Sequence, residues 1–342
     1  MKKFDRPHVA IVGATGAVGT TMLSILEERN FPAASLRLIA SARSAGKTVS
    51  TQWGDITIED LATADPCGID IALFSAGGDR SRAFAPEFAA AGATVIDNSS
   101  AFRMDANVPL VVANVNDAAI EEHLGIIANP NCTTMALMMA AGPLHRAAGL
   151  RSMIATSYQS VSGSGQTGMA QLAAEVDHFN ANRDGLAVGD WTAPGGEVYA
   201  RPIAYNVLPL AGSITAAGYT DEEWKLVHET RKILGRDSIR VEPTCVRVPV
   251  MVGHGIAATM WFDRDMDVEE AAQALRETHG AQLWDDGKVP TPLDSAGIDD
   301  VLIGRLRRSV GHPGGISLFA IGDNLRKGAA LNAVELGERL LN

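Results

Sequence analysis

One cysteine, Cys132, stands where its thiol could act as a nucleophile. It lies in the run Asn129-Pro130-Asn131-Cys132-Thr133-Thr134, just before the apolar stretch 135–139, so we expect it to begin a buried helix. Only the thiolate of a cysteine reacts well, and the dipole and unpaired N–H groups of a helix N-terminus favour that anion. The same N–H groups could hold an oxyanion. Placement alone leaves a second interpretation open, a small buried side chain that packs as a hydrophobe.

A glycine turn far upstream has the context of a dinucleotide-binding loop. The predicted strand 8–12 runs into Gly13-Ala14-Thr15-Gly16-Ala17-Val18-Gly19, which opens a helix predicted over 20–29. Glycines let a backbone approach a pyrophosphate closely, and the helix N-terminus attracts its charge. The spacing is a variant of the usual one, and an ordinary tight turn is the alternative. The strand–turn–helix order favours a cofactor bound at Gly13, Thr15, Gly16, Ala17 and Val18.

The end of the second predicted strand, 36–40, favours NADP over NAD. NAD enzymes usually place an acidic residue about 20 positions beyond the glycines, where it binds the ribose hydroxyls. Here no acidic residue occurs between Glu28 and Asp55. The loop after the strand instead offers Arg43 and Ser44, and a guanidinium with hydroxyls suits a 2′-phosphate. A solvated basic loop is the alternative.

A thiol together with a nicotinamide cofactor indicates aldehyde oxidation through a thioester, or the reverse reaction. Such chemistry needs a proton carrier that works near neutrality, which histidine provides. His254 lies in Val252-Gly253-His254-Gly255, predicted as a glycine-flanked turn between two strands. A turn histidine without a chemical role is the alternative.

Length and composition limit the class of protein. The chain has 342 residues, enough for two domains, and 46% of them are hydrophobic, as in a globular protein. Its formal net charge of −11 argues against binding to nucleic acid or to an anionic membrane surface. Three scattered cysteines make no disulfide framework, and we see no cluster of metal ligands. Without a secretory or membrane-spanning stretch, we expect a cytoplasmic protein.

The chain divides into a predicted parallel α/β domain and a predicted α+β domain. Strands expected at 8–12, 36–40, 69–74 and 94–97 alternate with helices, which predicts a Rossmann-like parallel sheet whose strand-end loops converge on one crevice. Later strands at 151–161, 238–246 and 255–262, with a helix at 221–234, predict an α+β domain with an antiparallel or mixed sheet. The tail, 327–341, has the pattern of an amphipathic helix that packs back on the first domain. We expect an NADP-binding domain at 1–131, completed by 323–342, and a substrate-binding and dimerisation domain at 132–322.

Six segments, taken together, closely resemble the bacterial aspartate-semialdehyde dehydrogenase family. The likeness runs from about residue 8 to the end of the sequence, and the set is specific even where single motifs are not. The segments are 13–19, 97–103 (Asp-Asn-Ser-Ser-Ala-Phe-Arg), 129–134, 157–163 (Ser-Tyr-Gln-Ser-Val-Ser-Gly), Arg247-Val248-Pro249-Val250 with His254, and 323–330 (Asp-Asn-Leu-Arg-Lys-Gly-Ala-Ala).

The resemblance implies NADP-dependent, reversible conversion of L-aspartyl-4-phosphate to aspartate-4-semialdehyde with release of phosphate. That step leads towards lysine, diaminopimelate, threonine and methionine, and family precedent implies a homodimer. The residues carried over by matching position are Cys132 as nucleophile, His254 as acid/base, Gln159 to orient the acyl group, Arg247 for the α-carboxylate, Glu222 for the ammonium, Arg103, Lys225 and Asn131 for phosphate, and Ser162, Gly163 and Asn324 for the cofactor.

One departure from the family pattern is visible, and three rival functions remain. Where the family often reads Val-Val-Pro-Glu-Val-Asn, this chain has Val-Val-Ala-Asn-Val-Asn at 111–116, which removes a glutamate. The first rival is an N-acetyl-γ-glutamyl-phosphate reductase; these enzymes share the chemistry but usually place Pro-Gly before the cysteine, whereas Asn131 precedes Cys132 here. The second rival is a malonyl-type CoA reductase, and the third is a non-catalytic NADP-binding paralogue.

Overall fold

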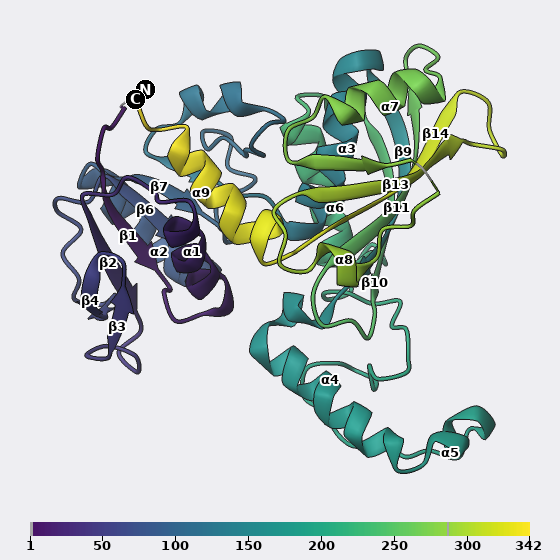
Figure 1. Cartoon of the computed structure of the whole chain (residues 1–342), viewed down its shortest axis with the longest axis horizontal. Coiled ribbons are helices and arrows are strands. Elements are labelled where there is room, and N and C mark those ends of the chain that lie inside the picture. The colour runs from purple at the N-terminus through teal and green to yellow at the C-terminus, as the bar shows by residue number, and fades with distance from the viewer. Residues whose placement is uncertain (1–2, 286) are drawn as a thin grey trace. The chain divides into compact units, whose positions relative to one another are not determined.

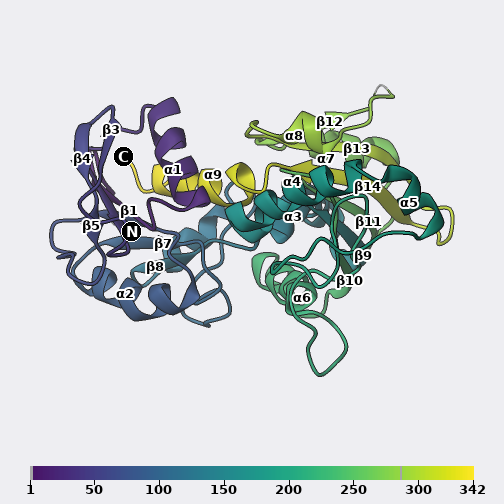
Figure 2. The same ribbon diagram turned by 90° about the horizontal axis from the view of Figure 1, so that it is seen from below.

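The computed structural model describes residues 3–285 and 287–342, which fold into two compact units (Figures 1 and 2). Unit 1 holds the residues up to Gly142, together with His228–Asp237 and Leu325–Asn342. Unit 2 holds Pro143–Val227 and Ser238–Asn324. The division falls inside two helices, α3 (Cys132–Ala148) and α6 (Asp221–Ile233).

Unit 1 is built on a six-stranded sheet with the order β5-β2-β1-β6-β7-β8, in which every neighbouring pair is parallel. Strands β6 and β7 are buried at every position, as expected for parallel strands that are covered on both faces. The further elements of the unit are β1 (His8–Val12), α1 (Ala17–Glu28), β2 (Ser35–Ala40), the hairpin β3 (Thr48–Thr51) and β4 (Gly54–Thr57), β5 (Glu59–Asp60), β6 (Ile71–Phe74), α2 (Gly78–Ala90), β7 (Thr94–Asp97), a 3-10 helix at Asp117–Glu122, β8 (Ile126–Ala128), a π-helix at Arg326–Ala330 and α9 (Leu331–Glu338).

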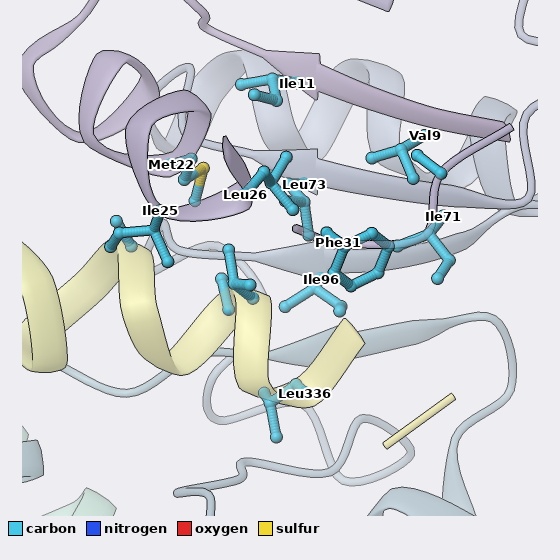
Figure 3. Close-up of a cluster of buried hydrophobic side chains, with 14 of the residues drawn as sticks. Val9, Ile11, Met22, Ile25, Leu26, Phe31, Ile71, Leu73, Ile96 and Leu336 are labelled. Carbon is cyan, nitrogen blue, oxygen red and sulfur yellow. The ribbon is translucent and has the colours of Figure 1, made fainter. Parts of the chain in front are cut away.

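Alternate residues along the strands of this sheet enter two separate cores, because successive strand side chains point to opposite faces. Ile11 and Leu73 pack against Met22 of α1 and Leu336 of α9 on one face (Figure 3). On the other face Phe74 meets Phe88 of α2 edge to face, with ring centroids 5.1 Å apart. Because β1, β2, β6 and β7 pair in parallel, their carboxyl ends share one edge of the sheet. This confirms the predicted parallel fold.

The tail is not the amphipathic helix predicted over 327–341. Its α-helix is shorter, α9, and every residue of Leu331–Gly337 is buried. The polar residues that suggested a solvent face have partners inside unit 1: Asn332 Oδ1 accepts the backbone N–H of Ala113 (2.9 Å), and Glu335 pairs with the buried Lys327 (2.5 Å). A polar stripe in the sequence therefore marks an internal hydrogen-bond network here.

Unit 2 contains a mixed six-stranded sheet with the order β10-β9-β11-β14-β13-β12. Strands β9 and β10 are parallel, and β11 is antiparallel to both β9 and β14. This confirms the predicted mixed sheet. The further elements are β9 (Leu150–Gln159), a 3-10 helix at Val161–Ser164, α4 (Gly165–Asn180), α5 (Arg183–Val188), β10 (Arg240–Arg247), β11 (His254–Phe262), α7 (Val268–Arg276), β12 (Ala281–Trp284), α8 (Pro292–Ser295), β13 (Val301–Arg308) and β14 (Gly315–Gly322).

The two faces of the β9 strand differ in exposure. Met153, Ala155 and Gln159 are buried, whereas Ile154 and Tyr158 on the opposite face are 51% and 39% exposed. An antiparallel or mixed sheet commonly leaves one face open in this way. Within unit 2 this leaves large apolar side chains on an open sheet face.

Candidate active site

The glycine turn of unit 1 has the shape that a dinucleotide requires. Gly13 has a φ of +91°, and a Cβ there would lie only 2.2 Å from the carbonyl oxygen of Ser75. The next turn opens α1, whose N-cap residue Gly16 makes no side-chain capping bond and whose first turn has no acidic residue. Backbone N–H groups at that helix end are thus suited to a pyrophosphate, so the residues present fit a dinucleotide cofactor.

The loop after β2 lies beside this turn. The backbone N–H groups of Gly13 and Ala14 both donate to Ile39 O, at 2.8 and 3.1 Å. In the loop that follows β2, the hydroxyl of the buried Ser44 lies 3.3 Å from Thr15 Oγ1, while Arg43 is exposed. Hydroxyls and a solvent-facing guanidinium therefore gather at the edge where the ribose end of a dinucleotide would lie.

Cys132 is the first residue of α3 and is half-buried. Asn131 caps this helix, because its Oδ1 accepts the backbone N–H groups of Thr133 (2.9 Å) and Thr134 (3.3 Å). The thiol thus lies at the positive end of a helix, where negative charge on sulfur is favoured. None of the three cysteines forms a disulfide, and burial raises the pKa of Cys245 to about 12, which leaves that thiol unreactive.

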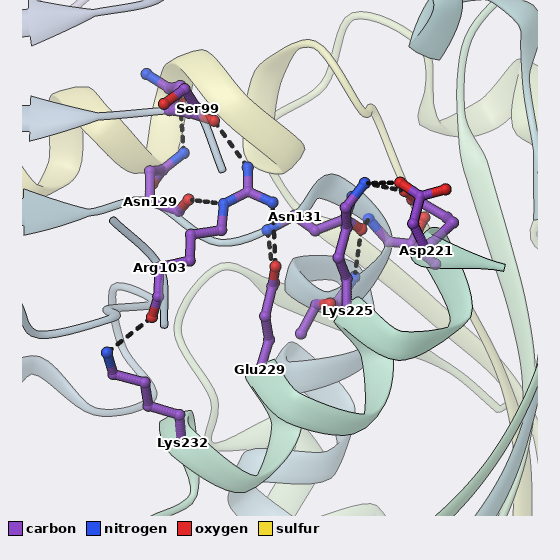
Figure 4. A network of polar contacts seen from close by, with 12 residues as sticks. Ser99, Arg103, Asn129, Asn131, Asp221, Lys225, Glu229 and Lys232 are labelled. Carbon is purple, nitrogen blue, oxygen red and sulfur yellow. Dashed lines mark hydrogen bonds and ion pairs between the residues drawn. The ribbon is translucent and has the colours of Figure 1, made fainter. Parts of the chain in front are cut away.

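Arg103 is buried in unit 1 and held at three of its nitrogen atoms (Figure 4). Nε donates to Asn129 O (2.9 Å), Nη2 to Asn98 O (2.7 Å) and Nη1 to Glu229 Oε1 (3.0 Å). A guanidinium has five N–H groups, so one N–H on each terminal nitrogen remains beyond these bonds. A pair of donors of that kind matches two oxygens of a phosphate.

In unit 2 the strand register places three predicted site residues in one row. Gln159 on β9 lies opposite Arg247 on β10 and opposite His254 on β11. All three are buried, and the side chain of Gln159 donates to Ser157 Oγ (3.1 Å) and faces Glu222 Oε1 (3.4 Å). His254 is therefore the first residue of a strand, not part of the predicted turn. Gly253, with a φ of +100°, makes the turn in its place.

The ring of His254 has one partnered and one unpartnered nitrogen. The backbone N–H of Ser160 donates to Nδ1 (3.1 Å), and Ser160 Oγ lies at the same distance from it. Because a backbone N–H only donates, Nδ1 is an acceptor and the neutral ring carries its proton on Nε2. The buried Nε2 has no hydrogen-bond partner among the described residues. Burial, and secondarily the Arg247 cation, lowers the pKa of His254 to about 3.

Gly163 packs closely against this row. A Cβ at Gly163 would lie 2.9 Å from Arg247 Nη1 and 3.1 Å from His254 Nε2, so a larger residue would displace these side chains. Arg247 Nη1 donates to Ser160 O (2.8 Å) and lines a cavity of 490 Å³ within unit 2. Its buried guanidinium suits a carboxylate ligand.

Asn324 joins the loops around the row. Its Oδ1 accepts the backbone N–H of Gly253 and the hydroxyls of Ser160 and Ser162, each at 3.0 Å. The Gly253 bond fixes which end of the amide is oxygen. Ser162, Gly163 and Asn324 are thus brought together with His254, as expected of residues at one site.

Three residues of α6 form a charged group of their own in unit 2. Lys225 Nζ lies 3.0 Å from both Asp221 Oδ2 and Glu222 Oε2 (Figure 4). Burial acts to lower the pKa of Lys225, but the two carboxylates outweigh it and raise that pKa above its usual value. The lysine is therefore a cation at neutral pH, beside a carboxylate that suits an ammonium.

Comparisons with known proteins cover nearly the whole chain. The semialdehyde dehydrogenase NAD binding domain matches residues 8–123, and the semialdehyde dehydrogenase dimerisation domain matches residues 142–327. An aspartate-semialdehyde dehydrogenase of Streptomyces akiyoshiensis is 52% identical over 339 residues, with 97% of each chain covered. One of Mycolicibacterium smegmatis is 48% identical, with 97% of this chain and 98% of that relative covered. The chain belongs to the aspartate-semialdehyde dehydrogenase family.

Solved structures of the aspartate-semialdehyde dehydrogenase family have the same fold. The crystal structure of aspartate semialdehyde dehydrogenase II from Vibrio cholerae matches with a TM-score of 0.92, at 43% identity and over 98% of each chain. A second structure of that enzyme, complexed with ASA, matches with a TM-score of 0.91, at 42% identity and over the same share of each chain.

The predicted site residues of this family member fall into two groups, one in each unit. Unit 1 holds the glycine turn, Arg43, Ser44, Arg103, Asn131 and Cys132, and unit 2 holds Gln159, Ser162, Gly163, Glu222, Lys225, Arg247, His254 and Asn324. The contacts above tie members to one another within each group. The chemical roles assigned from the resemblance stay predictions.

Three site residues escaped the sequence analysis: Ser157, Ser160 and Glu229. Each contacts a predicted residue, namely Gln159, His254 and Arg103 respectively. Ser157 and Ser160 lie in the same motif as Gln159, and Glu229 follows Lys225 by four positions on α6. Helical spacing could have singled out Glu229, but the sequence does not show that it is buried.

Asn114, at the departure from the family pattern, makes its contacts within unit 1. Asn114 has a φ of +72°, a conformation that asparagine adopts more readily than most residues. Its Oδ1 accepts Arg339 Nη2 (2.8 Å), and its backbone N–H donates to Asp117 Oδ1 (2.9 Å). These contacts involve none of the predicted site residues.

Proposed function

We propose that the chain catalyses the NADP-dependent, reversible conversion of L-aspartyl-4-phosphate to L-aspartate-4-semialdehyde and phosphate. The observation that carries the proposal is the match to aspartate-semialdehyde dehydrogenases over 97% of the chain, with Cys132 present at the capped N-terminus of α3. The reaction would serve lysine, diaminopimelate, threonine and methionine synthesis. No helix in 3–285 or 287–342 is long and apolar enough to cross a membrane, and three unbridged thiols agree with a cytosolic enzyme.

Covalent catalysis would begin with the Cys132 thiolate, which attacks the acyl carbon of the aspartyl phosphate. A bond forms between the sulfur and the acyl carbon. The bond between the acyl carbon and the bridging phosphate oxygen breaks, and phosphate leaves with that electron pair. NADPH, when bound, supplies the hydride that reduces the resulting thioester. We assign the departing phosphate to Arg103, Lys225 and Asn131, whose donors match its oxygens.

The row on the sheet of unit 2 would hold the rest of the substrate. We assign the α-carboxylate to Arg247 and the ammonium to Glu222, by charge. Gln159 would orient the acyl oxygen. His254 Nε2 is the ring atom left to meet a reacting group, so it would stabilise developing negative charge and carry the proton when the carbon–sulfur bond breaks.

The choice of NADP over NAD rests on the loop after β2. Ser44 lies beside Thr15, Arg43 faces solvent, and no acidic residue lies between Glu28 and Asp55 to repel a 2′-phosphate.

We further propose a homodimer that covers the open sheet face around Ile154 and Tyr158, in keeping with the matched dimerisation domain. We also propose that residues 1–131 and 323–342 make up the NADP-binding domain. Residues 132–322 would make up the substrate-binding and dimerisation domain.

A steady-state assay tests the function directly. Purified protein is supplied with aspartate semialdehyde, phosphate, and NADP or NAD in parallel, and formation of the reduced cofactor is followed. We expect phosphate-dependent turnover that favours NADP and is absent in Cys132→Ser. No turnover with this aldehyde would reject the proposed substrate, and equal use of both cofactors would reject the NADP assignment alone.

A further inference from the structure

One buried carboxylate of unit 1, Glu229, contacts two groups that the proposed chemistry uses. Its side chain is only 2% exposed. Oε1 lies 3.0 Å from Arg103 Nη1, and Oε2 accepts the backbone N–H of Asn131 at 2.7 Å (Figure 4). A single side chain thus connects a buried arginine with the residue that immediately precedes Cys132.

The contact with Arg103 fixes the plane of its guanidinium. The carbonyl oxygens of Asn129 and Asn98 hold Nε and Nη2, and among the described residues Nη1 is held by Glu229. The same helix also holds the backbone of this segment, because Lys232 Nζ donates to the carbonyl oxygens of Arg103 and Asp105 (2.7 and 2.8 Å). The remaining N–H groups of Arg103 therefore point in a direction set by α6.

The contact with Asn131 fixes the turn that leads into the nucleophile. Asn131 uses its side chain to cap α3 and its backbone N–H to reach Glu229. A charge-assisted bond from a backbone N–H to a carboxylate is short and strong. The two oxygens of one carboxylate thus hold both the start of the Cys132 helix and the side chain of Arg103.

We propose that Glu229 is a positioning residue that sets the orientation of Arg103 for phosphate and the position of the Cys132 turn. This rests on the proposed function, in which Arg103 binds phosphate. Both carboxylate oxygens of Glu229 are bonded to protein donors, which leaves it to act through them. Its effect reaches the reaction through the guanidinium and through the Asn131 amide, so its loss should be felt chiefly by phosphate.

Glu229→Gln tests the proposal in the direction that consumes phosphate. The variant keeps the size and shape of the side chain but lacks the charge and offers one acceptor where two are needed. Because a hydrogen bond to a charged group is lost, we expect the KM for phosphate to rise roughly tenfold or more. The KM values for the aldehyde and for NADP should stay within about twofold of the wild-type values.

A double-mutant cycle with Arg103→Lys separates positioning from mere stability. Lysine keeps the charge but not the fork, so this variant alone should raise the KM for phosphate. If Glu229 acts through Arg103, the double variant should be little worse than Arg103→Lys. Glu335→Gln, which breaks the buried pair with Lys327, is the matched control and should leave the KM for phosphate unchanged.

The outcomes distinguish two failures. An unchanged or lower KM for phosphate in Glu229→Gln would overturn the positioning role, and additive effects in the cycle would overturn its route through Arg103. An unchanged KM for phosphate in Arg103→Lys would instead reject the assignment of Arg103 in the proposed function. Should Glu229→Gln fail to fold, Glu229→Asp takes its place, because it keeps the charge but is too short to reach both partners.

Discussion

Replacing His254 with asparagine should make the protein less sensitive to acid. The ring is fully buried as a neutral imidazole, and burial, followed by the charge of Arg247, lowers its pKa from 6.5 to about 3. An unfolded chain takes up a proton at this residue once the pH falls below 6.5, whereas the folded chain does not. Stability is therefore complete above pH 6.5 and is lost progressively as the pH falls towards 3.

The size of the effect follows from the two pKa values. Between pH 7.5 and 5.0, one group with these values lowers the free energy of unfolding by about 2 kcal/mol. The figure depends little on how far below 5 the folded pKa lies, because the folded ring is neutral over this whole range. Asparagine cannot be protonated, and its amide oxygen can take the place of Nδ1 as the acceptor of the Ser160 N–H.

Urea unfolding of the wild type and of His254→Asn at both pH values measures the difference, with equal protein concentrations because a dimer is expected. Other titrating groups contribute to both proteins and cancel in the comparison. The wild type should lose about 2 kcal/mol more than the variant on going to pH 5.0. An equal loss in both would show that His254 is protonated in the folded protein at pH 5.0, and would refute the buried neutral ring.

Three further predictions concern the cofactor loop, the open sheet face and the departure from the family pattern. Arg43→Glu should raise the KM for NADP about tenfold through repulsion of the 2′-phosphate, with the KM for NAD unaffected; equal losses for both cofactors would count against the assignment. Ile154→Lys, on the open face of β9, should shift the protein from dimer to monomer in sedimentation at micromolar concentration, and an unaltered dimer would place the interface elsewhere. Asn114→Val should lower the free energy of unfolding by about 1–3 kcal/mol, because a β-branched residue is strained at a φ of +72°, whereas Asn114→Gly should cost less; equal stability of the two variants would contradict the strain argument.

Local patterns were sufficient to predict the parallel sheet and the start of the nucleophile helix. Strand β7 has the predicted bounds, 94–97, because a short apolar run ending in Asp-Asn-Ser-Ser leaves few other structures open. The helix at Cys132 is predicted from the apolar stretch 135–139 that follows the cysteine, and the structure adds that Asn131 caps it. Signals of this kind depend on neighbours in sequence.

The polar partners of the site could not be predicted in the same way. The row of Arg247, Gln159 and His254 depends on the register of three strands that are far apart in the chain, which no local pattern fixes. Glu229 looks like an ordinary helix surface residue in the sequence, and its burial comes from tertiary packing. The prediction of an amphipathic tail helix was wrong for a similar reason. Asn332 and Glu335 have buried polar partners, Ala113 and Lys327, that the hydrophobic pattern does not show.

The buried tail also has a consequence for the order in which the protein folds on the ribosome. Unit 1 begins with the first strands to be synthesised, yet its core includes Leu331, Val334 and Leu336, which are made only after all of unit 2. A nascent chain would thus carry an unfilled apolar face on β6 and β7 throughout the synthesis of about 180 residues. We expect chaperone binding to the nascent chain on that face, released when α9 emerges and closes it.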